Sequence, residues 1–278
     1  MKPSFLLTCL LVFSATVCTA QPEWFANVGI GPINYVGDLQ DKRFTTVEMK
    51  MNVAAGLSYQ ATPHFAANFS LMYGKIGATD AKNGAKWVFR NLNFQSSIFE
   101  ASLTAEADLN DITQFQNGFT DQNPQKFTPY IFAGVGLFHF NPYTYDPSGK
   151  KVYLQPLGTE AQTTPYSLWA FSIPFGIGAK YALNNNILIS AEFNVRKTFT
   201  DYIDDVSNYH YPDTTALAAS HGAEAALLSY RADEIPGNTY NFKDGYRGNP
   251  TKKDGYYSFM IKLSYQLFTG TPKFYYGY

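Results

Sequence analysis

The chain has 278 residues, a formal net charge of −1 and a sequence pI near 6.4. This balance excludes the strongly basic surface with which proteins bind nucleic acids, so we expect no nucleic-acid partner. Charged residues make up 15% of the chain, well below the ~25% of soluble domains, and aromatic residues reach 17%. Few charges and many Tyr and Phe are typical of a protein with aromatic girdles at two membrane interfaces.

The first twenty residues predict a secretory signal peptide. Lys2 gives a positive start, residues 5–17 form an almost unbroken apolar run, and small residues at 18–20 predict cleavage after Ala20. The alternatives are a membrane anchor, for which the run is shorter than the ~20 residues required, and a lipoprotein modified at Cys18, for which residues 15–17 match poorly. Both cysteines, Cys9 and Cys18, lie in this segment, so the expected mature chain, residues 21–278, has no disulfide.

After Ala20 the chain has no apolar run of the ~18 residues that a transmembrane helix needs. Instead, apolar and polar side chains alternate one for one in segments of about ten residues. This pattern is typical of β-strands with one apolar face and one polar face. We expect eight strands, at Trp24–Val36, Met49–Gln60, Phe65–Ile76, Asn93–Leu109, Thr128–Tyr143, Tyr166–Leu183, Ile187–Tyr202 and Tyr256–Phe268.

Two of these segments need comment. Asn93–Leu109 is rich in Ala, Glu and Leu, which favour helices, but its apolar period is two rather than 3.6, so it is assigned as a strand. Pro174 interrupts the sixth strand without a backbone N–H to donate, which predicts a bulge or kink there.

The pattern of connections distinguishes the two folds that alternating strands allow, a soluble sandwich and a transmembrane barrel. Short turns follow the second and sixth strands, and long polar segments follow the third, fifth and seventh, as expected for periplasmic turns and outer loops. The connection at 110–127 is too long for a tight turn, and residues 216–230 predict a short helix that His221–Gly222 interrupts. We therefore predict a single-domain, all-β, eight-stranded antiparallel transmembrane β-barrel of the outer-membrane type, with a long loop at 204–254.

The polar faces of the strands carry charges of both signs that would point into the barrel. An eight-stranded barrel is just wide enough for side chains to fill, so a lumen plugged by ion pairs is favoured over a narrow channel. The expected lumen network consists of Lys50, Glu100, Glu106, Lys180, Glu192, Arg196 and Lys262. Because an unpaired buried charge costs several kcal/mol, we expect Glu192 or Glu100 to pair with Arg196 or Lys262.

No catalytic, cofactor or metal motif is apparent. The four histidines lack metal-ligand spacing, and neither a Gly-x-Ser-x-Gly elbow nor a phosphate-binding loop is present. His139, between two phenylalanines, is a candidate for lipid hydrolysis at the membrane edge, with an interfacial histidine as the favoured interpretation. Asp201, Asp204 and Asp205 could bind calcium, although a solvated strand end is favoured.

A series of unusual strings carries a family resemblance. They are YVGDL at 35–39, YGK at 73–75, RNLNF at 90–94, YIFAGVG at 130–136, FHFNP at 138–142, LQPLGTE at 154–160, IPFG at 173–176 and RKTFTDYIDDV at 196–206. In this order they closely resemble the DUF6089 family, which includes the PorG-like outer-membrane barrels of Bacteroidota. The resemblance covers essentially the whole mature chain, and the segment at 204–254 and the tail at 269–278 depart from the pattern.

The resemblance implies an outer-membrane barrel in contact with lipid. For the PorG branch it implies an accessory role in type IX secretion, bound to a periplasmic ring made of a lipoprotein and its partner. It carries over no catalytic residue and no cofactor, and it marks Arg90, Asn91, Gln155, Pro156, Arg196, Lys197, Thr198, Asp201, Tyr202, Asp204 and Asp205 as family positions. A small passive transport barrel and a lipid-modifying enzyme are the alternatives. We expect no enzymatic activity.

Overall fold

The computed structural model describes residues 23–62, 64–84, 87–109, 127–184, 186–238 and 246–267. The predicted signal peptide, most of the long connection at 110–127 and the tail at 269–278 lie outside these residues. The strands are β1 (Glu23–Val36), β2 (Lys50–Gln60), β3 (Phe65–Thr79), β4 (Asn93–Asp108), β5 (Phe127–Tyr145), β6 (Lys151–Tyr153), β7 (Trp169–Ala182), β8 (Ile187–Thr198) and β9 (Gly255–Gln266).

The long strands form a closed barrel. Each pairs antiparallel with the next long strand in the chain, and β1 pairs with β9 to close the sheet. Strand β6 is short and pairs only with the end of β5, beyond the barrel wall. The predicted eight-stranded antiparallel barrel is therefore confirmed, and the segment Asn93–Leu109 is a strand, as its period of two indicated.

The strand ends differ from the predicted ones by a few residues. The seventh predicted strand ends at Thr198 rather than Tyr202, because the chain turns inward over the barrel and its carboxylates bind loop groups there. The bulge predicted at Pro174 is wrong. The register of β7 against β5 and β8 is the same on both sides of Pro174, so no extra residue is inserted, and the proline only interrupts the β5 ladder.

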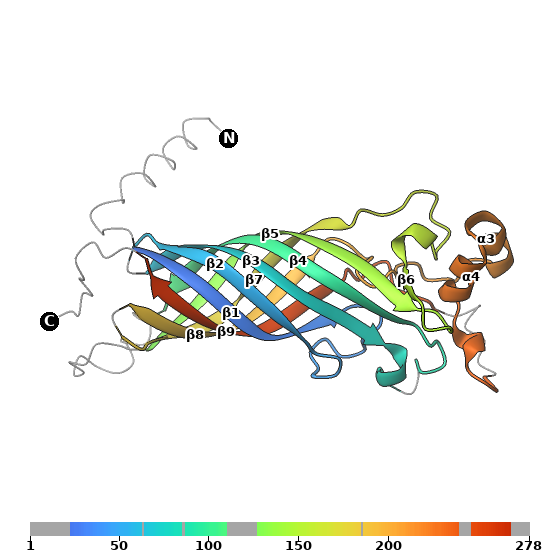
Figure 1. The fold of residues 1–278 in the computed structure, drawn as a ribbon, viewed down its shortest axis with the longest axis horizontal. Coiled ribbons are helices and arrows are strands. Elements are labelled where there is room, and N and C mark those ends of the chain that lie inside the picture. The colour runs from blue at the N-terminus through green and yellow to red at the C-terminus, as the bar shows by residue number, and fades with distance from the viewer. Residues whose placement is uncertain are drawn as a thin grey trace, which may run out of the picture.

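The two ends of the barrel differ in the length of their connections (Figure 1). Short turns join β2 to β3 and β7 to β8, and the start of β1 and the end of β9 lie at this same turn end. The opposite, loop end carries the long connections, with the short 3₁₀ turns η1 (Asp80–Lys82), η2 (Gln155–Leu157) and η3 (Ala232–Glu234). This asymmetry places the turns in the periplasm and the loops outside the cell.

The helix predicted at 216–230 is present as two helices, α3 (Thr214–His221) and α4 (Ala223–Ser229). They separate at Gly222, whose φ of 92° is a conformation that glycine adopts at little cost. Asp213 accepts a hydrogen bond of 2.9 Å from the Ala216 backbone N–H and so caps α3. Among the residues that the structure describes, no helix has the length and apolar character to cross a membrane.

The outer face of the barrel is an apolar band. Side chains that alternate outward along each strand are large, apolar and exposed, such as Val135 and Ile177, each with 61% of its surface accessible. Aromatic residues lie toward both borders of the band: Trp24, Tyr59, Phe65, Tyr181 and Tyr265 at the turn end, and Tyr73, Phe99 and Trp169 toward the loop end. Such a surface is what a lipid bilayer, rather than water, accommodates.

The interior of the barrel changes character along its axis. Toward the turns it is polar, whereas toward the loops it holds an apolar core that continues into the loops. This core includes Ile33, Tyr35, Leu39, Met72, Ile76, Phe94, Ile98, Phe138, Phe140, Leu154, Ile203, Val206 and Tyr256. Apolar packing therefore holds the loops against the end of the barrel.

Introducing a charged residue in the middle of the apolar band tests whether this face of the barrel contacts lipid. Leu103 is 56% exposed and pairs with Val135, so Leu103→Arg places a charge near the middle of the band. We expect it to lower the free energy of unfolding by about 2–4 kcal/mol, measured by urea denaturation in phospholipid vesicles. Leu227→Arg, on the exposed side of α4, is the matched control and should change it by under about 0.5 kcal/mol. Equal effects would contradict the assignment.

Candidate functional site: a closed lumen and a polar cap

The turn-end half of the lumen is filled by two lysines bound to carboxylates. Lys180 forms ion pairs with Glu106 and Asp108, the latter at 3.1 Å. Lys262 pairs with Glu192 at 2.6 Å, and Glu192 also accepts a hydrogen bond of 2.6 Å from the Tyr130 hydroxyl. These contacts join β4, β5, β7, β8 and β9 across the barrel.

Glycine makes room for this packing at one position. A Cβ atom added to Gly178 on β7 would lie 2.4 Å from the Tyr130 ring, much closer than carbon atoms approach. The ring of Tyr130 is almost fully buried at this place, which lets its hydroxyl reach Glu192. Gly178 therefore fixes the orientation of a lumen side chain.

A second layer crosses the lumen at Arg196. Its guanidinium pairs with Glu100 of β4 at 3.3 Å and donates a hydrogen bond of 2.5 Å to the Ser258 hydroxyl of β9. Glu100 also accepts hydrogen bonds from the hydroxyls of Tyr256, at 2.7 Å, and Ser172, at 3.0 Å. Both members of the ion pair are nearly inaccessible to solvent, and the surrounding donors satisfy the carboxylate.

Within the described part of the chain, side chains occupy much of the lumen and leave small cavities. A cavity of about 50 Å³ lies beside Arg196, and one of about 30 Å³ lies nearer the turns. Such volumes suit a few water molecules. Met72 and Phe138 flank Glu100 in the strand register and pack in the same layer, and Ile98, nearer the loops, belongs to the apolar core that fills the interior beyond it.

The structure brings together six of the seven residues predicted for the lumen network. Of the pairings that the sequence left open, it shows Glu100 with Arg196 and Glu192 with Lys262. Lys50 lies apart, at the loop end of β2 near Gly77, where it is partly buried. It forms no ion pair with a residue that the structure describes. It therefore takes no part in the central network.

The loops form a second polar structure, which we call the cap: the connections β1–β2, β3–β4, β5–β7 and β8–β9. Arg90, almost fully buried, binds both carboxylate oxygens of Asp80 at 2.6 and 2.7 Å. It also donates to the carbonyl oxygens of Arg247, at 2.5 Å, and Asp38, at 3.1 Å. One side chain thus links three of the loops.

Arg247 provides the corresponding link to the remaining loop. It pairs with Glu160 and donates a hydrogen bond of 3.2 Å to the hydroxyl of Thr159, both in the β5–β7 connection. Glu160 in turn accepts hydrogen bonds from the backbone N–H groups of Ser207, at 2.8 Å, and Asn208, at 3.0 Å. With these two buried arginines, the cap is cross-linked into one unit.

Most family positions marked by the resemblance lie in or next to this cap. Asn91 donates to the Arg231 carbonyl at 3.1 Å, Gln155 donates to the Tyr166 carbonyl at 2.8 Å, and Thr198 donates to the Asp254 carbonyl at 2.5 Å. Pro156 lies in η2, and the Tyr202 ring stacks on Tyr166 at 4.5 Å. Lys197 is the exception, because its side chain is exposed on the outer face of β8. Most family positions in the unusual strings therefore make contacts that hold the cap together.

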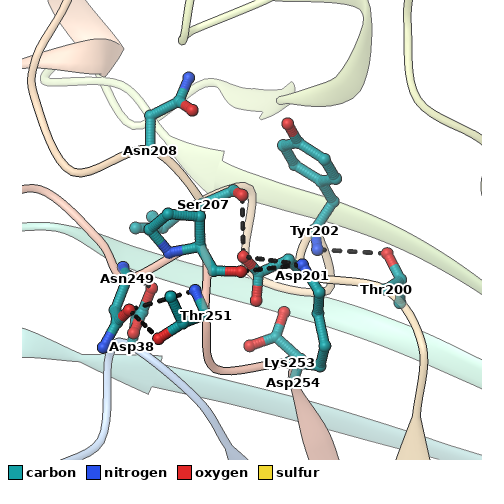
Figure 2. Close-up of polar contacts among 12 residues, drawn as sticks. Asp38, Thr200, Asp201, Tyr202, Ser207, Asn208, Asn249, Thr251, Lys253 and Asp254 are labelled. Carbon is teal, nitrogen blue, oxygen red and sulfur yellow. Dashed lines mark hydrogen bonds and ion pairs between the residues drawn. The ribbon is translucent and has the colours of Figure 1, made fainter.

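The favoured interpretation of Asp201, Asp204 and Asp205, a solvated strand end, is wrong. All three side chains are about 2% exposed or less, so the segment is not a solvated strand end. Within the described ranges, no group of acidic, His or Cys side chains has the arrangement of a metal site. Figure 2 shows Asp201 accepting a hydrogen bond from Ser207, at 2.8 Å, and facing Lys253, 3.6 Å away. The carboxylates serve instead as acceptors for cap donors.

Two of the cap carboxylates share one donor. The Tyr35 hydroxyl lies 2.5 Å from Asp204 and 3.0 Å from Asp254, but it has a single hydrogen to donate. Burial, reinforced by the charges of neighbouring carboxylates, raises the pKa of both Asp204 and Asp254 well above the usual value. Burial also raises the pKa of Asp38 and of Asp205 to about 6. The cap therefore holds protons that these groups would lose in water.

Several cap residues were not found from the sequence, among them Asp80, Arg247 and Asp254. Arg90 and Arg247 are 157 residues apart, and the Tyr35–Asp254 contact spans 219 residues. Such pairs leave no local periodicity. The sequence signal for the cap is compositional: the loops contain many charged residues. Their partners lie in other loops, which come together only when the barrel closes.

A double-mutant cycle tests the Arg196 layer. Arg196→Met leaves Glu100 buried without a cation, and we expect the free energy of unfolding in vesicles to fall by about 3–5 kcal/mol. Adding Glu100→Gln should restore much of this loss, because no uncompensated charge remains. Lys253→Met, which removes a half-exposed partner of Asp201, is the control and should cost under about 1 kcal/mol. Additive effects of the two lumen substitutions would contradict the pairing.

The raised pKa values predict that the cap weakens as the pH rises. The folded cap binds more protons than the unfolded chain above the normal carboxyl pKa near 4, so stability is lost as pH rises through 6 and beyond. For Asp205 alone the loss is about 2–3 kcal/mol. Hydrogen exchange of cap amides, corrected for intrinsic rates, should show more opening at pH 8 than at pH 5. Asp254→Asn should reduce this dependence, whereas Asp213→Asn, on an exposed helix cap, should not. A cap that tightens with rising pH would contradict it.

Comparison with known proteins agrees with this architecture. The family model described as a domain of unknown function, DUF6089, matches residues 4–218. The outer membrane protein PagN of Salmonella typhimurium is 31% identical over 172 residues, which are 60% of this chain and 61% of PagN, so the match spans less than two thirds of that protein.

Two solved barrels are similar in fold only. Neisserial surface protein A (NspA) gives a TM-score of 0.42 at 9% identity, and a major outer membrane protein of Thermus thermophilus gives 0.42 at 12%. In each case 89% of this chain and 100% of the other are covered. Neither similarity bears on function. From its family match, its apolar band and its closed strand order, the chain is an outer-membrane β-barrel that belongs to the DUF6089 family.

Proposed function

We propose that this protein is a structural barrel that anchors a partner assembly at the outer membrane and neither conducts solutes nor catalyses a reaction. In its specific form, the proposal is an accessory component of type IX-like secretion machinery, bound to a periplasmic ring lipoprotein and its partner. The general part of the proposal rests on geometry. The specific part rests on the resemblance of the series of strings to the DUF6089 family, which includes the PorG-like barrels.

The observation that carries the proposal is the closed lumen. A passive transport barrel needs a passage wider than a water molecule, but Arg196, Glu100 and Tyr256 cross this lumen, and apolar side chains fill the space above them. Opening a passage would break a buried ion pair, which is costly. The geometry therefore supports a rigid body whose surfaces, not its interior, carry the function.

The lipid-modifying alternative has little support at its candidate residue. His139 lies on the outer, lipid-facing side of β5, half-buried, with its ring 5.0 Å from that of Trp169. A hydrolase needs a nucleophile and an orienting group within hydrogen-bond reach of the base. Among the described residues, the contact found for His139 is the aromatic one, which suits an interfacial side chain.

The turn end is the surface available to a periplasmic partner. The two short turns, near Thr62 and Asn184, lie at this end, as do the end of β4 and the start of β5. The cap faces the opposite side and is held together by its own contacts. A partner assembly in the periplasm would thus bind without disturbing the cap.

Affinity purification after mild detergent extraction, with mass spectrometry of the bound proteins, tests the proposal. We expect the wild-type barrel to recover a periplasmic lipoprotein and its partner in stable ratio. A flexible Gly–Ser insertion between Ala61 and Thr62 should reduce that recovery several-fold, because it displaces the docking surface. The same insertion after Gly149, in the turn at Asp146–Lys150 of the cap, should leave recovery unchanged.

Two further outcomes test the general and the specific form of the proposal separately. Recovery of folded barrel without any ring component, under conditions that keep other membrane complexes intact, would overturn the secretion role. Steady conductance of the wild-type protein in planar bilayers would overturn the closed-lumen argument itself.

A further inference from the structure

The β1–β2 loop folds back over the outer wall of the barrel. Asn34 of β1 occupies a position of the outward-facing alternation, yet it is fully buried. Its side-chain amide donates hydrogen bonds to the backbone carbonyls of Thr45, at 2.8 Å, and Val47, at 2.9 Å. The Tyr257 hydroxyl fixes the same loop through the backbone N–H of Thr45, at 2.8 Å, and its carbonyl, at 2.5 Å. The loop thus shields polar groups on a face that otherwise meets lipid.

Phe44, at the centre of this loop, continues the lipid-facing band. Its ring lies 5.0 Å from Tyr257 and 5.7 Å from Phe193, and Phe193 lies 4.7 Å from Phe259 within the band. Even so, 53% of Phe44 remains exposed. One side of the ring is packed on the barrel, and the other is presented outward at the loop-end border of the band. This is the position of an interfacial aromatic anchor.

Exposed basic residues lie close to this anchor in the chain and in the strand register. Lys42 and Arg43 precede Phe44 and are exposed, and Lys197 is exposed on the outer face of β8, two residues beyond Val195, the register partner of Tyr257. The structure gives none of the three an ion pair with a residue that it describes. Of the nearby carboxylates, Glu48 pairs with Lys82, and Asp41 accepts a hydrogen bond of 2.6 Å from the Trp87 ring nitrogen. With Asp41 counted, the three cations still leave this surface with a net positive charge.

We propose that this surface, formed by Lys42, Arg43, Phe44 and Lys197, binds an outer-leaflet lipid through an anionic, phosphate-bearing head group. Phe44 lies among the upper acyl chains, and the three cations meet the phosphate above it. The surface is continuous with the lipid-contacting band, and its net positive charge complements a phosphate. The occupant is therefore a lipid of the same membrane rather than a protein. This inference does not depend on the anchoring role.

Native mass spectrometry of the folded protein in non-ionic detergent, titrated with phosphatidylglycerol or phosphatidylcholine, tests the proposal. We expect wild type to bind the anionic lipid more tightly. Lys42→Gln with Arg43→Gln should reduce this preference about tenfold, because two cations near the phosphate are lost. Lys150→Gln with Lys151→Gln, which removes two charges from the β5–β6 turn of the cap, is the matched control and should retain the preference.

Two further measurements separate the contribution of Phe44 from that of the cations to lipid binding. Phe44→Ala should weaken binding of both lipids while leaving their ratio unchanged, and salt near 1 M, where the Debye length is about 3 Å, should abolish the preference in wild type. The salt arm also serves if the double variant fails to fold. An unchanged preference in the double variant or in high salt would overturn the proposal. Full competition by glycerol phosphate would overturn it too, since it would indicate a site for soluble phosphate.

Discussion

The contact of lipid with the outer face of every strand is the constraint on which the rest of the structure depends. Hydrocarbon offers no hydrogen bonds, so each backbone N–H and C=O of the wall must pair within the sheet. Closure between β1 and β9 pairs most of these groups. The β1–β9 ladder is interrupted at Pro32 and the β5–β7 ladder at Pro174, but the register is the same on both sides of each interruption. Where a polar side chain does face outward, as Asn34 does, the β1–β2 loop covers it. The loop thus keeps the outer wall apolar at this point.

The same constraint determines what fills the interior. A barrel of this size turns half of its side chains inward into a space that they themselves occupy. Charges there must pair, and they do so in layers: lysines with carboxylates near the turns, then Glu100 with Arg196. Beyond that layer the interior becomes an apolar core that joins the cap. The closed lumen of the described strands is thus a consequence of small size and complete packing, and it favours a structural over a transporting protein.

The repeating part of the structure could be predicted from the sequence, and the non-repeating part could not. Alternation with period two predicts the strands and the inward charges. The cost of a buried charge predicts that Glu192 or Glu100 binds Arg196 or Lys262, but not which carboxylate binds which cation. The cap has no period: Arg90 meets Arg247 and Tyr35 meets Asp254 only after closure brings distant loops together. For the same reason Asp201, Asp204 and Asp205, which look like a solvated or metal-binding run, prove to be buried acceptors.

The most direct measurement of lipid contact uses single cysteines on β9. The chain has two cysteines, Cys9 and Cys18, both in the expected signal peptide, so the mature background is free of thiols. Spin labels at positions 259, 260, 261, 262 and 263 can be compared for collision with oxygen, which concentrates in lipid, and with a water-soluble nickel chelate. Oxygen accessibility should peak at Phe259, Ile261 and Leu263 and fall at Met260 and Lys262. Uniform values, or high nickel accessibility at the three outward positions, would contradict lipid contact and with it the proposed architecture in the membrane.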